Sequence, residues 1–185
     1  MSTHCITRFV DCDELEHWPP NNGMIATYLT NDTLKQDGSF FPMVYGKARE
    51  IVCAWRHHDG NPAVHGGLLK NILTRMHELD NEYSPSSNGA GHRTAYAVQN
   101  LERTYDVYAQ LMPAGTHHIG EHFTYVVYFG SRRRIALQVI VCRYLPDSGT
   151  SHRENIYFGP LDWFIPDEVE ALAYPSESEE DVSSD

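Results

Sequence analysis

The sequence predicts an α+β fold in which two helices pack on one face of a mainly antiparallel sheet. Two apolar runs, 123–129 and 135–142, flank a short polar segment that contains Gly130, which is typical of a β-hairpin. Apolar residues recur at helical spacing between the early and the late strand-like segments. The expected order along the sequence is strands, then two helices, then further strands. One sheet with helices on one face accounts for this order.

Three strand-like segments precede the helices. Residues 24–30 and 49–55 are rich in β-branched and aromatic side chains, which favour extended structure. Residues 40–45 form a shorter segment, and Pro42 places it at a sheet edge because proline has no amide hydrogen to donate.

Two helices are expected next, over residues 65–79 and 92–104. The first has one apolar face, formed by Leu68, Leu69, Ile72, Leu73, Met76 and Leu79. The inward side of the second is expected to comprise Thr94, Ala95, Val98 and Leu101. The small residues of this second helix predict close packing against the sheet.

Further strands follow the helices. Residues 107–112 form one that Pro113 and Gly115 end, and the hairpin comes after it. Two short apolar groups, 156–158 and 163–165, are expected to dock a final segment on the domain.

The 185 residues fit one domain with two peripheral segments. We expect an N-terminal extension over 1–22, whose composition is mixed and acidic, and a single α+β domain over 23–170. An acidic, disordered tail is expected over 171–185. From Ser176 onward it contains five carboxylates and Val182 as its only apolar side chain, which is too little to pack.

Charge and cysteine content exclude several classes of protein. The net charge of -11 argues against a general binder of the phosphate backbone, which needs a basic face. The four cysteines form no Cys-x-x-Cys pair, so the motifs of zinc ribbons and thioredoxins are absent. No apolar run approaches the ~20 residues of a membrane span and no secretory leader follows Met1, so we expect a cytoplasmic protein without a membrane partner.

The strongest candidate site follows the predicted strand 49–55. Four ionisable side chains end that strand: Arg56, His57, His58 and Asp59. Gly60 and Pro62 then turn the chain toward the first helix. Loops held by a rigid scaffold often carry function, so this loop is a candidate for ligand binding. We expect Asp59 to accept bonds from turn amides and to be structural before it is catalytic.

A second candidate segment is the turn before the second helix, which contains Asn88, Gly89 and Gly91. Helix N-termini attract anions, so this turn resembles a phosphate-binding loop, although the lysine of a P-loop is missing. Together with the loop at Arg56 we expect it to form one polar pocket for a small anionic ligand. The alternative is a flexible turn made of permissive residues.

A local basic run stands at the turn of the predicted hairpin. It consists of Arg132, Arg133 and Arg134. With nearby tyrosines it suggests contact with RNA or a nucleotide. The alternative is a solvated turn that protects the hairpin register, and the acidic total charge favours this interpretation.

Eleven histidines make a metal site worth weighing. One group is His57, His58, Asp59 and His65, and another is His117, His118 and His122. Adjacent strand residues point to opposite faces, so His57 and His58 cannot chelate together without a distortion. No His-Glu-x-x-His helix is present either, and we expect no metal or other cofactor.

Three blocks over residues 49–142 carry a family resemblance. They are Trp55-Arg-His-His-Asp-Gly-Asn-Pro62 with the paired leucines after it, the glycine turn that opens an alanine-containing helix, and His122-Phe-Thr-Tyr-Val-Val-Tyr128. The pattern resembles a small protein family of bacteria and their phages whose members have a strand ending in Y-R-H-W-D-G-Y-P. His58 and Asn61 stand where that family has tryptophan and tyrosine. No activity is assigned to the family, so the resemblance implies a phage or bacterial context and no particular reaction.

We therefore expect a non-catalytic accessory protein of a phage or bacterium. It would bind a host protein or a small anionic ligand, in the host cytoplasm if it is phage-encoded. The absence of a complete catalytic motif, the small size and the acidic charge favour this role. The alternatives are a small metal- or His-dependent hydrolase or nuclease, and an RNA- or nucleotide-binding module.

Overall fold

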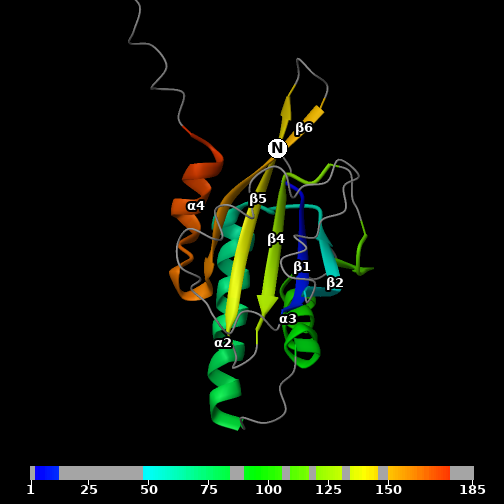
Figure 1. The fold of residues 1–185 in the computed structure, drawn as a ribbon, viewed down its shortest axis with the longest axis vertical. Helices are drawn as coiled ribbons and strands as arrows, with labels where there is room; N and C mark the ends of the chain where they lie inside the picture. The colour runs from blue at the N-terminus through cyan, green and yellow to red at the C-terminus, as the bar shows by residue number, and fades with distance from the viewer. Residues whose placement is uncertain are drawn as a thin grey trace, which may run out of the picture.

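A six-stranded sheet carries helices on one of its faces in the computed structural model (Figure 1). The structure describes residues 3–12, 48–83, 90–105, 109–116, 120–130, 134–145 and 150–175. The strands are β1 (Cys5–Cys12), β2 (Ala48–Arg56), β3 (Ala109–Pro113), β4 (Phe123–Phe129), β5 (Ile135–Leu145) and β6 (Thr150–Pro160).

The order across the sheet is β3-β2-β1-β4-β5-β6. The strands β1 and β4 run parallel, and every other neighbouring pair runs antiparallel. Because β1 is hydrogen-bonded on both of its edges, this first described strand lies inside the sheet, as Figure 1 shows.

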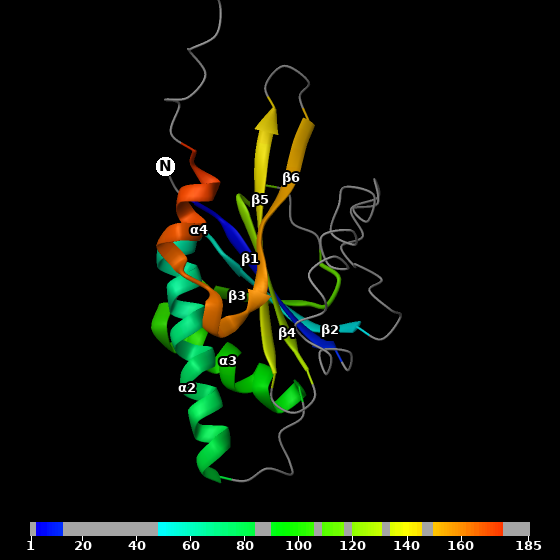
Figure 2. The ribbon, with the colours of Figure 1, turned by 60° about the vertical axis from the view of Figure 1, so that its left-hand side comes forward.

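The helices α2, α3 and α4 lie on the same face of the sheet (Figure 2). One turn of π-helix, η3 (Pro62–Gly66), leads directly into α2 (Gly67–Tyr83), and α3 (Ala90–Tyr105) packs against α2. A single 3-10 turn, η5 (Leu161–Trp163), precedes α4 (Pro166–Ala173). Within the described ranges, no helix has the length and apolar character needed to cross a membrane.

The main core lies between the helices and the sheet. Phe9 of β1 and Phe123 of β4 belong to it together with Leu69 and Leu73 of α2 and Leu101 of α3. Each of these side chains is almost completely buried. Burial of one large apolar side chain contributes roughly 1.5–3 kcal/mol, so this layer is the main source of stability.

The opposite face of the sheet is buried as well. One cluster there contains Val10, Val126 and Ile140, and another contains Cys53 and Trp55. All residues of β4 are buried, which explains why this strand is mainly apolar and does not alternate with exposed polar residues.

The α+β class and the mainly antiparallel sheet predicted from the sequence are confirmed. The strand at 49–55, the hairpin and both predicted helices are present, with α4 as a third helix that the sequence pattern did not predict. One detail of α3 differs, because Ala97 faces the core and Ala95 is exposed. The strands expected over 24–30 and 40–45 lie outside the described residues.

The expected N-terminal extension over 1–22 is wrong for residues 5–12, which form the inner strand β1. The physical reason is that both sides of this segment are apolar enough to be buried, as Phe9 on the helix side and Val10 on the opposite side show. The expected start of the tail at residue 171 also falls inside α4, where Ala173 is buried. Residues 176–185 lie outside the described part of the chain.

Candidate functional site

Arg56, the last residue of β2, belongs to a chain of polar side chains on the helix-covered face. Thr7 Oγ1 lies 2.7 Å from His65 Nε2, and Arg56 Nη1 lies 3.3 Å from His65 Nδ1. Arg56 Nη2 lies 3.4 Å from a carboxylate oxygen of Asp59. This network of side chains therefore runs from the buried hydroxyl of Thr7 to the carboxylate of Asp59, whose side chain is 68% exposed.

The donors and acceptors of this side-chain network fix the protonation state of His65. Arginine can only donate, so His65 Nδ1 accepts from Arg56, and the ring proton stays on Nε2 and is donated to Thr7 Oγ1. Burial and the neighbouring Arg56 charge lower the pKa of His65 from its ordinary 6.5 to about 3. His65 is therefore neutral and held in a single tautomer.

The loop that follows β2 is pressed against the start of β1. Asp59 has a φ of 51°, in the left-handed region that Asp tolerates better than most residues. A Cβ on Gly60 would lie 2.7 Å from Cys5 Cβ and 2.9 Å from Cys5 N. Gly60 N donates to Thr3 O at 2.8 Å, and the Tyr125 hydroxyl donates to Gly60 O at 2.7 Å. The Asp-Gly pair thus permits a close approach of two backbones.

The N-terminus of η3 is capped from two elements. Asn61 Oδ1 accepts from Val64 N at 3.4 Å. The Glu170 carboxylate of α4 accepts from Asn61 Nδ2 at 2.9 Å and from Ala63 N at 2.7 Å. A helix N-terminus favours a negative charge, and here the chain itself supplies one. Glu170 therefore occupies the helix N-terminus after the Arg56 loop, where the sequence suggested a small anion.

His57 joins a cluster of rings at the same end of the sheet. Its ring centroid lies 5.6 Å from that of Trp55 and 5.7 Å from that of His4. His4 in turn lies 5.7 Å from His122, whose Nδ1 accepts from His4 N at 3.2 Å. His58 is exposed, with its ring 6.5 Å from that of His57. In the described part of the chain, no three His, Cys, Asp or Glu side chains are placed to hold a metal ion.

The second predicted segment is separated from this loop. Gly91 lies in the first turn of α3, and Arg93 beside it donates from Nη1 to Gly130 O at 3.0 Å. Gly130 follows the C-terminal end of β4. Arg56 pairs with Cys5 of β1, and Cys5 pairs with Phe123 at the start of β4. Gly91 and the Arg56 loop therefore lie toward opposite ends of the sheet, and the expectation of one shared pocket is wrong.

The remaining predicted site residues are only partly described. Arg134 is half-buried, and its carbonyl accepts from Gly130 N at 2.9 Å at the hairpin turn. Four others lie outside the described residues: Asn88, Gly89, Arg132 and Arg133.

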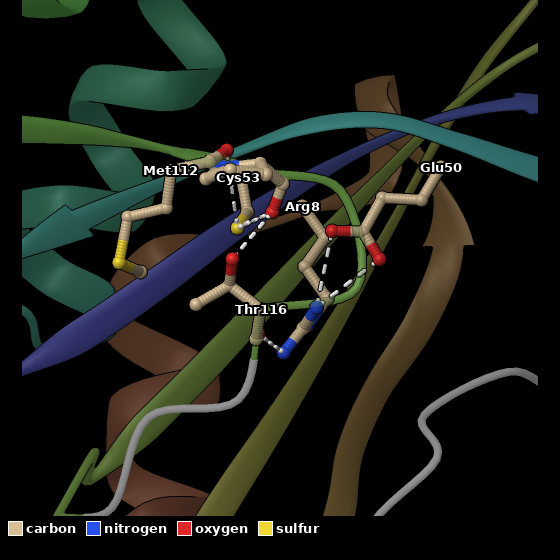
Figure 3. Close-up of polar contacts among 6 residues, drawn as sticks. Arg8, Glu50, Cys53, Met112 and Thr116 are labelled. Atoms are coloured by element: carbon tan, nitrogen blue, oxygen red, sulfur yellow. Dashed lines mark hydrogen bonds and ion pairs between the residues drawn. The ribbon is translucent and has the colours of Figure 1, made fainter.

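A buried polar network that the sequence did not indicate lies on the opposite face of the sheet (Figure 3). Arg8 Nη1 lies 3.1 Å from each carboxylate oxygen of Glu50, and Arg8 Nη2 donates to Thr116 O at 2.9 Å. Cys53 Sγ lies 3.4 Å from Pro113 O. Burial and the Glu50 charge raise the pKa of Cys53 to about 11, so the thiol stays protonated. Local sequence carries no signal for this network, because its members meet only when distant segments pair.

The last segment of the described chain exposes large apolar side chains. Phe164 and Val169 pack into the core from it, whereas four other large apolar side chains of the segment are exposed. They are Trp163, Ile165, Leu172 and Tyr174, with exposed fractions of 67%, 46%, 58% and 56%. We call these four residues the C-terminal face.

The predicted loop residues thus fall into two groups. Arg56 and Asp59 share a network with His65, whereas His57 and His58 lie in or beside the ring cluster.

Comparisons of the chain with protein-family models, curated proteins and solved structures find no match. Function is therefore inferred from the geometry and chemistry of the chain's own residues.

Proposed function

We propose that the protein is a non-catalytic accessory protein that binds another protein through the C-terminal face. The observation that carries the proposal is where exposed apolar side chains gather. Of the seven large apolar side chains exposed in the described ranges, four belong to this face. Exposed apolar patches mark sites of protein association, and tryptophan and tyrosine are frequent anchors of such interfaces.

The burial of the Thr7 hydroxyl and of two thiols supports the non-catalytic part of the proposal. Thr7, whose hydroxyl bonds to His65, is fully buried, so this hydroxyl is not presented at the surface. Burial raises the pKa of the Cys5 thiol and of the Cys53 thiol, and a protonated thiol is a poor nucleophile.

A protein partner is better supported than a small anion. Glu170 already occupies the N-terminus of η3, where the loop at Arg56 would have presented an anion site. The further proposal that the partner belongs to the host of a phage, or to a bacterium, rests on the resemblance carried by the block from Trp55 to Pro62.

A photo-crosslinking amino acid at Ala171, an exposed position of α4, tests this function. In lysate of the source cell we expect a discrete crosslinked protein from position 171 and none from Glu102, an exposed control position on α3. Leu172→Ser should weaken capture by the full chain without lowering its melting temperature, because Leu172 is 58% exposed. Equal crosslinking at both positions, or capture that Leu172→Ser leaves unchanged, would refute the proposed function.

A further inference from the structure

The C-terminal face also carries acidic side chains between its apolar ones. Three exposed carboxylates stand there: Asp162, Asp167 and Glu168. The segment 161–175 contains no Lys or Arg. Helical spacing places Glu168 on the same side of α4 as Ile165 and Leu172. Glu168 therefore shares one side of α4 with exposed apolar groups, and Asp162 and Asp167 stand beside others along the segment.

Two basic side chains of neighbouring elements lie next to this segment and donate to its backbone carbonyls. Lys70 Nζ donates to Phe164 O at 2.6 Å. Arg143 donates to Ala173 O at 2.9 Å and to a Glu154 carboxylate oxygen at 2.9 Å. These contacts hold the two ends of α4 and direct both cations at groups other than the three carboxylates.

We propose that the partner docks a basic amphipathic segment on the C-terminal face, an inference that rests on the proposed function. Its apolar stripe would cover Trp163 and Leu172, and Lys or Arg residues beside the stripe would meet Asp167 and Glu168. The chain continues after Pro175 with five more carboxylates, which adds to the attraction for a cationic segment.

Charge disfavours the other occupants of such a surface. Nucleic acid and anionic lipid headgroups have the same sign as the carboxylates of this face. A two-fold dimer through it would bring the Asp167 and Glu168 carboxylates of both copies into one interface. The net charge of -11 adds a general repulsion between copies.

A labelled peptide of Lys and Leu with one leucine stripe is a direct probe of the full chain. Two reference peptides complete the set: a scrambled sequence of the same composition, and a Glu-Leu peptide with the same stripe. By fluorescence anisotropy we expect the striped basic peptide to bind about tenfold more tightly than the scrambled one. We expect no binding of the acidic peptide, and weaker binding of the basic one when salt rises from about 0.05 M to about 0.5 M.

Two double variants that each remove two negative charges locate the site. Asp167→Asn with Glu168→Gln should weaken peptide binding about threefold to tenfold. Glu78→Gln with Glu102→Gln, at exposed positions of α2 and α3, should weaken it less than about twofold. Equal losses in the two double variants would overturn the proposal, since net charge alone would then explain binding.

The outcomes separate this inference from the proposed function. A partner that crosslinks at Ala171, combined with peptide binding that ignores Asp167→Asn with Glu168→Gln, leaves the proposed function standing and refutes a basic partner. Absence of the crosslink and of any Leu172→Ser effect refutes both. Sedimentation with anionic vesicles, or a dimer that Leu172→Ser dissociates, would replace the basic segment by a membrane or by a second copy.

Discussion

Burial and the Arg56 charge together keep His65 neutral, and the His65 ring makes stability depend on pH. The pKa of His65 is about 3 in the folded chain and ordinarily 6.5. Between these values the unfolded chain binds a proton that the folded chain does not bind. The contribution is therefore fully present above about pH 6.5 and is lost as the pH falls toward about 3.

The His65→Gln variant should have a shallower pH dependence of stability. Between about pH 7 and about pH 4.5, the free energy of unfolding of the unmodified chain should fall by about 2 kcal/mol more than that of the variant. Urea unfolding at the two pH values measures the difference. His77→Gln, at an exposed position of α2, is the control and should keep the original slope. Identical slopes for His65→Gln and the unmodified chain would contradict the neutral state of the buried ring.

Gly60 is needed for space, whereas Gly91 is not. A Cβ on Gly60 meets backbone and side-chain atoms of Cys5 at under 3 Å, and a Cβ on Gly91 meets nothing within 4 Å. We expect Gly60→Ala to lower the free energy of unfolding by about 2–4 kcal/mol. Gly91→Ala should change it by no more than about 0.5 kcal/mol, toward greater stability. Chemical denaturation of both variants checks this contrast, and a stable Gly60→Ala would mean that the loop can move away from β1.

At the scale of elements, Glu170 joins α4 to the start of η3. Glu170→Ala removes the acceptor of Ala63 N and Asn61 Nδ2, so it should lower stability by about 1–2 kcal/mol. Glu168→Ala, which removes an exposed carboxylate of the same helix, is the matched control and should cost under about 0.5 kcal/mol. Thermal melting of the two variants measures the difference, and equal losses would assign the effect to α4 as a whole.

The Arg8–Glu50 pair links β1 to β2 on the other face of the sheet. Its side chains are 4% and 2% exposed, so removal of one partner leaves a buried charge. Arg8→Met should cost about 3–5 kcal/mol, and the double variant Arg8→Met with Glu50→Leu should recover most of that loss. A double-mutant cycle by urea unfolding tests this coupling. A double variant no more stable than Arg8→Met would show that the Thr116 contact, and not the ion pair, dominates.

At the scale of the whole molecule, we expect the C-terminal residues up to Pro175 to be needed for folding and those after it to be dispensable. Deletion of 176–185 should leave the melting temperature unchanged, because that segment holds Val182 as its only apolar side chain. Deletion from residue 162 should prevent folding, because it removes Phe164 and Val169 from the core. Circular dichroism and thermal melting of the two truncated chains test the division. A large loss of melting temperature in the shorter deletion would show that 176–185 contributes to packing.

The candidate site was predictable in position but not in role. Arg56 and Asp59 stood out because an apolar run ends in charged residues, and both belong to a polar network in the structure. Their partner Thr7 is far away in sequence and reaches them only because β1 pairs with β2. Glu170 offers no sequence signal either, since an acidic residue on a short helix is ordinarily a solvated one.

The sequence by itself determined the local structure. Residues close together in the sequence specify α2 through the spacing of its apolar side chains, and β4 and β5 through their apolar runs. They also specify the turn after Arg56 through its turn-forming residues. Only the tertiary structure decided that β1 lies between β2 and β4, that Glu170 caps η3, and that four large apolar side chains of the C-terminal segment stay exposed. Those outcomes depend on contacts between segments far apart in the chain. Local propensity does not encode such contacts, because their free energy comes from the summed burial and pairing of both partners.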